Sequence, residues 1–286
     1  MKIVKYFFEF LFILVLFFIF KILGYKLSSN LGAFIGSLFG PLFRSKKKIL
    51  TNIKKALPKV DEKNIELIVK KMWKNYGRIL SEYVFIKNFR NPIYNKFLTV
   101  EGQEILNQLK QSRESVVFIS GHFNNFELMA MQIEKSGINL AAIYRPLNNI
   151  FLNKIMERIR KKYICKKQIK KGLGGTRELL RLFKENYSVA LMIDQRVSEG
   201  IKVNFYGQKA STTTIPAQLA KKYGCKIVPI YIERINSIHF KMTINKPIHY
   251  NKENTIEEIT QNLNKWLERM ILVNPSQWIW SHDRWK

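Results

Sequence analysis

Residues 115–127, SVVFISGHFNNFE, contain the clearest structural signal in the chain. The first six form an almost continuous apolar run, which is typical of a strand buried on both faces. Gly121 and His122 follow, and a helical pattern then continues to about Lys135. A buried strand that leads through a short turn into a helix is the repeating unit of α/β folds. The pattern therefore places His122 at the carboxyl end of a strand, where open α/β sheets bind their ligands.

The same alternation continues on both sides of this segment. We expect further strands at residues 96–101, 140–144, 188–193, 225–232 and 238–244. We expect helices within residues 46–90 and at residues 103–110, 149–162, 176–186, 212–222 and 256–272. The predicted fold class is α/β, with a central and mostly buried sheet flanked by helices and an N-terminal transmembrane helix.

The predicted transmembrane helix lies at residues 6–23, where eighteen residues contain only two charges, Glu9 and Lys21. At 1.5 Å per residue such a helix is roughly 27 Å long, which is just enough to cross a hydrocarbon core. A cleaved signal peptide is the main alternative, but no small-x-small cleavage pattern follows. Lys and Arg are denser after the segment than before it. This bias predicts a retained single-pass anchor with most of the chain in the cytoplasm.

A second apolar run at residues 31–43 has Gly32, Gly36 and Gly40 four positions apart. On a helix these glycines share one face and allow a neighbouring helix to approach closely. Thirteen residues are too few to span a membrane, so we expect a helix that lies at the interface or is buried and ends at Pro41. An anchor at residues 1–45 and a catalytic domain at residues 46–286 are the predicted domains.

The composition is strongly basic, with 49 Lys and Arg against 21 Asp and Glu and a net charge of +28. Residues 1–60 contain eleven Lys or Arg and one acid, and residues 145–185 contain thirteen and three, so each segment has a net charge of +10. An anionic partner is therefore expected. Nucleic-acid-binding motifs are absent from the sequence, which favours lipid or an acidic protein. The two cysteines, Cys165 and Cys225, have no zinc-binding spacing and are expected to be reduced thiols.

His122 and Glu127 are the candidate catalytic residues. If His122 lies in the turn and Glu127 in the first helical turn, the two side chains can meet. A histidine that a carboxylate holds in one tautomer is suited to act as a general base. The free N–H groups of the helix N-terminus can bind an anion. The alternative is a packed histidine at a strand end and an exposed glutamate.

Several motifs together resemble the late acyltransferases of lipid A biosynthesis, the lauroyl and myristoyl transferases, within the larger superfamily that has an H-x4-D/E signature. The resemblance covers about residues 5–286 in the same order. It rests on His122 and Glu127 and on these further segments: Tyr144-Arg145-Pro146, Asp194-Gln195, Asn204-Phe205-Tyr206-Gly207, the run Thr212–Thr214, and PSQWIWSHDRWK at residues 275–286. Asn124 and Phe126 stand where the family often has Gly and Trp, and Asn tolerates the unusual backbone angles of such a turn.

The resemblance implies that an acyl group moves from the thioester of acyl carrier protein to a hydroxyl of a lipid A precursor. His122 would take the hydroxyl proton, and Glu127 would orient His122 and stabilise its charged form. A thioester is already activated, so neither a metal nor another cofactor is expected. The candidates for substrate binding are Arg145, Arg158, Arg160, Asn125, Asp194 and Gln195. The order along the helix does not decide which of Arg158 and Arg160 faces the site.

Two other functions remain open at this point. The same chemistry can serve a lysophospholipid or a glycosylated lipid as acceptor. A basic membrane protein without enzymatic activity, which binds anionic lipid, also explains the anchor and the charge. The expected location is the bacterial inner membrane, with the catalytic domain on the cytoplasmic side.

Overall fold

The computed structural model describes residues 2–286 and confirms the α/β prediction. A seven-stranded sheet has the order β1-β9-β8-β2-β5-β3-β4. Its strands are β1 (Leu98–Glu101), β2 (Val117–Ser120), β3 (Leu140–Tyr144), β4 (Lys167–Lys170), β5 (Ser188–Met192), β8 (Ile227–Asn236) and β9 (His239–Ile244). The strands from β8 to β4 are parallel, and β9 is antiparallel to β8. All four residues of β2 are buried, as the apolar run predicts for a central strand.

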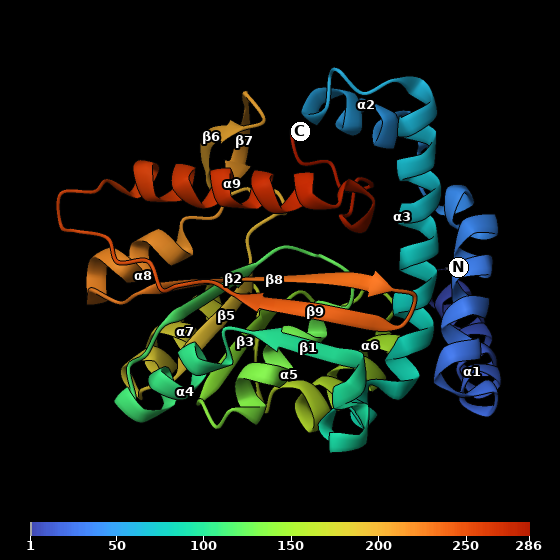
Figure 1. Ribbon diagram of the computed structural model, residues 1–286, viewed down its shortest axis with the longest axis horizontal. Helices are drawn as coiled ribbons and strands as arrows, with labels where there is room; N and C mark the ends of the chain where they lie inside the picture. The colour runs from blue at the N-terminus through green and yellow to red at the C-terminus, as the bar shows by residue number, and fades with distance from the viewer. Residues whose placement is uncertain (1) are drawn as a thin grey trace.

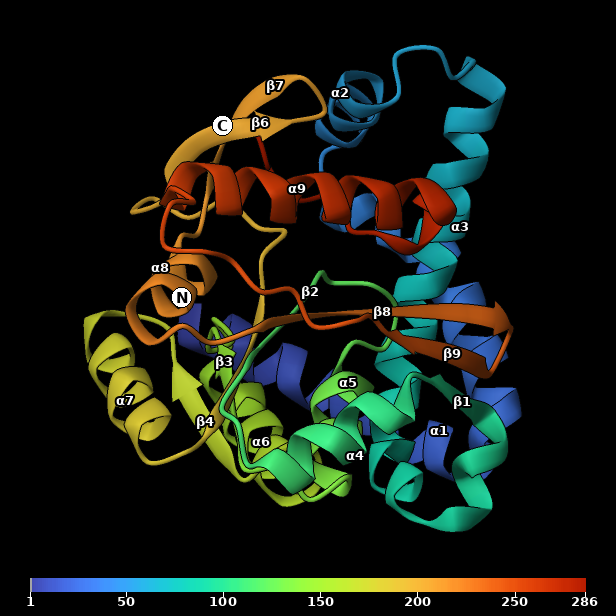
Figure 2. The ribbon, with the colours of Figure 1, turned by 60° about the vertical axis from the view of Figure 1, so that its left-hand side comes forward.

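Helices cover both faces of the sheet. In Figure 1, α4 (Gln103–Ser112), α5 (Glu127–Lys135) and α7 (Leu173–Lys184) lie below the sheet, and α9 (Ile256–Val273) lies above it. Figure 2 shows α8 (Ile215–Tyr223) beneath the amino-terminal end of α9. The helix α6 (Ile150–Ile159) continues into a π-helical turn at Arg160–Ile164. Five short 3-10 or π segments also connect elements, at Gly40–Phe43, Tyr83–Arg90, Pro92–Phe97, Arg160–Ile164 and Pro275–Gln277.

Three strands were not predicted. The strand β4 is a short edge strand in which two lysines flank Gln168 and Ile169, and its apolar content is too low to give a strand signal. The hairpin of β6 (Ile201–Phe205) and β7 (Gln208–Thr212) forms a separate two-stranded sheet. Its two-residue turn has positive φ at both Tyr206 and Gly207, 51° and 73°. This is the geometry of tight hairpins, but Tyr is not a residue that normally indicates it.

The long helix α1 (Lys2–Phe39) bends at Gly24, where φ is 74° and ψ is 170°. Together with the 3-10 turn that follows, it is the one helix within residues 2–286 that is long and apolar enough to cross a membrane. Its second half lies beside α3 (Glu62–Glu82), at the right of Figure 1. A Cβ atom at Gly32 or Gly36 would collide with the backbone of Gly77 on α3. The predicted close approach is thus confirmed, and Gly77 is the partner.

We expect Gly77→Leu to separate α1 from α3 and to destabilise the protein by about 3 kcal/mol, because overpacking a tight contact costs about 1–3 kcal/mol or more. Thermal unfolding in detergent measures the effect. Gly174→Leu is the matched control, since this glycine is also helical but has no atom within 4 Å of a built Cβ. An equal loss of stability in both variants would contradict the proposed helix contact.

Candidate active site

The His122 imidazole lies at the carboxyl edge of the sheet. Strand β2 ends at Ser120, and the chain turns through Asn124, whose φ of 44° is in the left-handed region, before α5 begins at Glu127. Asn124 therefore adopts the backbone angle for which a glycine is commonly used. Its side-chain amide donates to the carbonyl of Ile232 and to Gln277, which fixes the turn from the other side. The ring of His122 packs edge-on against Phe126, with centroids 4.8 Å apart.

Asp194 holds His122 in place. The Nδ1 atom of His122 lies 2.7 Å from Oδ1 of Asp194, and the backbone N–H of His122 donates to Oδ2 at 2.9 Å. This contact follows from the topology, because β5 is the parallel neighbour of β2 and Met192 pairs with Ser120. Trp278 donates its indole N–H to Oδ2 of Asp194 at 2.9 Å. An ionised carboxylate only accepts hydrogen bonds, so the proton of the imidazole lies on Nδ1, and Nε2 is the basic atom.

The electrostatics of the pair agree with this assignment. Burial lowers the pKa of His122, but the charge and hydrogen bond of Asp194 raise it by more than burial lowers it, so the pKa lies above the usual 6.5. Burial raises the pKa of Asp194, but the charge and hydrogen bonds of His122 and the indole of Trp278 outweigh it and lower the pKa to about 2. Asp194 is fully buried and ionised at neutral pH, which makes it a fixed negative charge beside the imidazole.

Glu127 has different partners from those predicted. Its Oε1 atom accepts from Nε of Arg160 at 2.7 Å and from a terminal guanidinium nitrogen at 2.6 Å. The hydroxyl of Tyr83 also donates to Oε1, at 3.1 Å. The prediction that Glu127 orients His122 through a hydrogen bond is therefore corrected, since Asp194 makes that bond. Glu127 still lies close enough for its charge to raise the pKa of His122.

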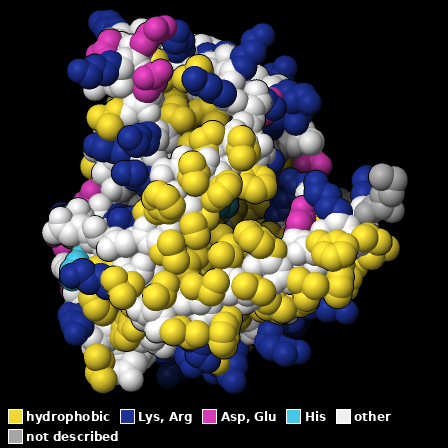
Figure 3. All heavy atoms as spheres, turned by 90° about the vertical axis from the view of Figure 1, so that its right-hand side faces the viewer, with side chains coloured by type: hydrophobic (Ala, Val, Ile, Leu, Met, Phe, Trp, Pro, Cys, Tyr) yellow, Lys and Arg dark blue, Asp and Glu magenta, His cyan; other side chains and the backbone are white. Residues whose placement is uncertain are grey.

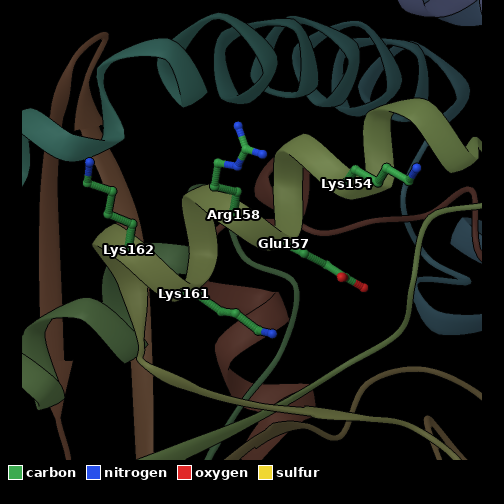
Figure 4. Close-up of a pocket in the computed structure, with 5 residues that line it drawn as sticks. All are labelled: Lys154, Glu157, Arg158, Lys161 and Lys162. Atoms are coloured by element: carbon green, nitrogen blue, oxygen red, sulfur yellow. The ribbon is translucent and has the colours of Figure 1, made fainter.

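The structure also decides between the two arginines. Arg160 is the first residue of the π-helical turn and points into the molecule, where only 12% of its side chain is exposed. Arg158 lies in an open groove on the outside of α6, together with Lys154, Glu157, Lys161 and Lys162. In Figure 4, Arg158 and Lys162 extend to one side of this helix, and Glu157 and Lys161 extend to the other. Arg160 is thus the arginine of the site.

His122, Glu127 and Arg160 are among the residues that line a cavity of about 320 Å³. The rest of the lining is mainly apolar and comes from the sheet and from two helices. It includes Met129, Ala130, Ile143, Ile164, Ala190 and Leu191. Such a cavity suits a hydrocarbon chain whose reactive end lies beside the histidine. Two predicted substrate-binding residues, Arg145 and Gln195, also line the cavity, and Arg145 is exposed.

Asn125 does not line this cavity. It is fully buried, and neither polar atom of its amide has a hydrogen-bond partner within residues 2–286. No group of three or more His, Cys, Asp or Glu side chains in the described chain could hold a metal ion. Cys165 and Cys225 are free and buried.

Sequence reasoning missed the contribution of the carboxyl-terminal segment. Tryptophans of this kind suit packing or a membrane interface, and Trp278 and Trp280 are buried, with ring centroids 4.7 Å apart. Trp278 additionally bonds Asp194, and Gln277 accepts from Asn124 and from the backbone of Arg234. The segment thus supports both halves of the His122–Asp194 pair. The segment at residues 275–286 was noted only for the family resemblance, and its sequence does not indicate that Trp278 bonds Asp194.

We expect Trp278→Phe to lower kcat about tenfold, because it keeps the aromatic packing and removes one hydrogen bond to a buried carboxylate, a contact worth about 1.5–3 kcal/mol. Trp280→Phe is the control, since its indole donates instead to the carbonyl of Pro275. Steady-state kinetics and melting temperature of both variants separate the effects. Similar melting temperatures with a lower kcat only for Trp278→Phe support the role, and equal kcat values contradict it.

Comparison with known proteins identifies the family. The family model for "Bacterial lipid A biosynthesis acyltransferase" matches residues 1–286. The chain is 23% identical over 271 residues to the lipid A biosynthesis lauroyltransferase of Escherichia coli K12, covering 92% of this chain and 87% of that protein. It is 21% identical over 268 residues to the palmitoleoyltransferase of the same strain, covering 92% and 86%. The crystal structure of a 1-acyl-sn-glycerophosphate acyltransferase from Thermotoga maritima aligns with a TM-score of 0.43 and 15% identity, over 89% of this chain and 98% of that one.

Proposed function

Because the chain belongs to the bacterial lipid A biosynthesis acyltransferases, we propose that it transfers a fatty acyl chain from acyl carrier protein to a hydroxyl of a lipid A precursor. The observation that supports this reaction best is the His122–Asp194 pair at the wall of an apolar cavity. The cavity can hold the acyl chain, and the imidazole can accept the hydroxyl proton.

In the proposed reaction His122 is the general base. Its Nε2 atom takes the proton of the acceptor hydroxyl while the hydroxyl oxygen attacks the thioester carbonyl. The new C–O bond forms, the C–S bond breaks, and the proton passes from His122 to the leaving thiolate. Asp194 fixes the reactive tautomer and stabilises the imidazolium that forms. No covalent intermediate with the enzyme is needed, because a thioester is already activated.

Glu127 and Arg160 contribute an ion pair to the wall of the cavity, and each has a role in the proposed reaction. Arg160 presents a mostly buried guanidinium at the cavity wall, where it can stabilise negative charge on the carbonyl oxygen. Glu127 holds that guanidinium in place and also acts on His122 through space. The carboxylate of Glu127 thus raises the pKa of His122 without a hydrogen bond to it.

We expect Glu127→Gln to lower kcat about tenfold and to move the acidic limb of the rate profile to lower pH. The neutral amide no longer raises the pKa of His122, so the base stays unprotonated at a lower pH. Glu134→Gln is the matched control, because Glu134 lies on the same helix and pairs with Arg90 away from the cavity. A pH profile of kcat/KM measures the shift. An identical profile in the parent and Glu127→Gln would contradict the proposed influence on His122.

The acidic acyl carrier protein is the proposed donor, and the groove on α6 shown in Figure 4 is its proposed contact. This groove presents four cations and one acid, and it lies on the element that also contributes Arg160 to the cavity. Opposite charges on two proteins speed their encounter and fix their orientation.

One experiment tests substrates and donor together. Purified protein in detergent is offered acyl carrier thioesters of several chain lengths with a lipid A precursor or with a lysophospholipid, and products are identified by mass spectrometry. Acylation of the lipid A precursor supports the proposal, and acylation of the lysophospholipid alone favours the other acceptor. Vesicle binding without any turnover would favour a lipid-binding protein without enzymatic activity.

The donor proposal has its own variants. Lys161→Glu with Lys162→Glu should raise the KM for acyl carrier protein and leave the KM for a small thioester unchanged. Lys70→Glu with Lys71→Glu makes the same charge change at exposed positions on α3. Equal kinetics with the carrier protein in both pairs would exclude the groove as the docking site.

We further propose that residues 1–45 attach the protein to the inner membrane and that residues 46–286 carry out the reaction on the cytoplasmic side. The exposed cations Arg44, Lys46, Lys47 and Lys48, which follow the apolar helix, support this location because the cytoplasmic leaflet carries anionic headgroups.

A further inference from the structure

The first half of α1 lies along the catalytic domain and does not project from it. Near its start, Phe7 and Phe10 contact Phe151 of α6, with centroids 5.7 Å apart in each case. Near the bend at Gly24, Phe17 packs against the hydrophobic core and Phe20 is only 1% exposed. One side of the helix is thus in contact with the domain at both ends.

These contacts limit how the helix can sit in a bilayer. The rise from Phe7 to Phe20 is roughly 20 Å, about two thirds of the thickness of a hydrocarbon core. If the helix stood along the bilayer normal, α6 would lie at the depth of Phe7, within or beyond the hydrocarbon. This helix carries Lys154, Glu157 and Arg158, and burying such charges in lipid costs several kcal/mol. A perpendicular crossing is therefore incompatible with a catalytic domain in water.

Polar contacts at the same end support this conclusion. The side chain of Asn149 donates to the carbonyl of Tyr6 at 2.8 Å and to Glu9 at 3.2 Å. Glu9 also lies 3.8 Å from Lys5, and 44% of its side chain is exposed. An exposed carboxylate and an amide are stable at a membrane surface, where water and headgroups reach them.

The opposite side of α1 is apolar and open. Figure 3 looks directly at this face, where hydrophobic side chains form a broad continuous area over both halves of α1, with Lys and Arg around its edge. On the first half the exposed residues include Phe8, Phe12, Val15, Phe18 and Ile22, which are 58–70% exposed. On the second half and the turn after it they are Leu27, Phe34, Leu38, Phe39, Leu42 and Phe43, which are 47–78% exposed.

We infer that both halves of α1 lie in the plane of one anionic leaflet, with this apolar face in the acyl region, and that α1 does not cross the bilayer. The lysines at the ends of its two halves, Lys2, Lys5, Lys21 and Lys26, are placed to contact anionic headgroups. This arrangement replaces the single crossing that length and composition predict.

The same arrangement places the mouth of the cavity at the leaflet surface, a step that rests on the proposed function. Asn149, which bonds α1, is the N-cap of α6, and Leu147 just before it lines the cavity. Leu147 and Ile150 are 39% and 51% exposed. A lipid acceptor can therefore keep its acyl chains in the leaflet while its hydroxyl reaches His122 from the side.

Cysteine labelling tests the topology. Lys2→Cys and Lys26→Cys place exposed thiols at the two ends of the first half of α1, and Lys184→Cys on α7 reports the side of the catalytic domain. A membrane-impermeant maleimide is added to inside-out and right-side-out inner-membrane vesicles. The parent protein gives the background, because its two cysteines are buried. We expect all three cysteines to react from the same side. Reaction of Lys2→Cys only from the side opposite to Lys26→Cys would overturn the inference.

Vesicle flotation tests whether the exposed apolar face of α1 binds an anionic lipid leaflet. Phe8→Lys with Phe12→Lys should reduce binding to phosphatidylglycerol vesicles at least tenfold. Asn107→Lys with Gln111→Lys adds the same charge at exposed positions on α4 and should leave binding unchanged. If the parent forms dimers through this face and does not bind vesicles, the leaflet is the wrong partner. Acyl transfer in detergent does not depend on topology, so a failure here and a failure of the proposed reaction can be told apart.

Discussion

Asp194→Asn is expected to lower kcat about a thousandfold with little change in the melting temperature. An amide can keep the shape of the carboxylate, but it has lost the charge that stabilises the imidazolium. Its NH₂ group can also face Nδ1 of His122 and shift the imidazole proton to Nε2, which is the atom that must accept a proton. General base catalysis of this kind contributes about 10²–10⁴ in rate, and both effects remove most of it.

The pH profile distinguishes this role from simple disruption. The base works only when His122 is neutral, and Asp194 raises the pKa of His122 above 6.5. In the parent protein the rate therefore falls with decreasing pH from a point above 6.5. In Asp194→Asn the carboxylate no longer raises the pKa of His122, whereas burial still lowers it. The fall in rate should therefore move to lower pH, and the maximal rate on the plateau should drop. Asp283→Asn is the control. Asp283 lies in the carboxyl-terminal segment and pairs with Lys48, so this variant should change neither the plateau rate nor the pH at which the rate falls. A parent-like plateau in Asp194→Asn would refute the assignment, and His122→Ala gives the level without the base.

Six of the seven strands of the main sheet and the position of His122 could be predicted because they depend on local patterns. A buried strand needs a continuous apolar run, and residues 115–120 supply it. Asp194 was placed at the end of a second buried strand for the same reason. Asp194 can bond His122 only because β5 is the parallel neighbour of β2. The sequences of the two strands do not determine which strands are neighbours in the sheet.

For Glu127, spacing along the chain predicted the wrong partner. Five positions separate His122 from Glu127, and a turn between them allows contact without requiring it. The actual partner, Arg160, reaches Glu127 from a π-helical turn that interrupts the regular helical register. Regular periodicity cannot tell Arg158 from Arg160 across such a turn. The close contact of Gly77 with α1 escaped prediction because it depends on which two helices cross.

A buried ion pair joins α3 to the sheet. Glu82 at the end of α3 is fully buried, and its two carboxylate oxygens lie 2.5 and 3.0 Å from the guanidinium of Arg234 on β8. Asn75 accepts from the same guanidinium, and Ser29 on α1 donates to Glu82. The three elements that meet here come from distant parts of the chain, so the pair fixes how α1 and α3 sit on the sheet.

We expect Glu82→Ala to destabilise the protein by about 3–5 kcal/mol, because it leaves Arg234 buried without its counter-charge. For a chain of this size the melting temperature should fall by about 10 °C. Glu101→Ala is the control, since its pair with Lys241 is exposed and such pairs contribute about 0–1 kcal/mol. Glu82→Leu with Arg234→Met removes both charges and should recover much of the loss. If the single and double variants melt at the same temperature, lost packing and not the unpaired charge accounts for the effect. Calorimetry in detergent, with acyl transfer measured below the transition, then shows whether the placement of α1 matters only for stability or also for turnover.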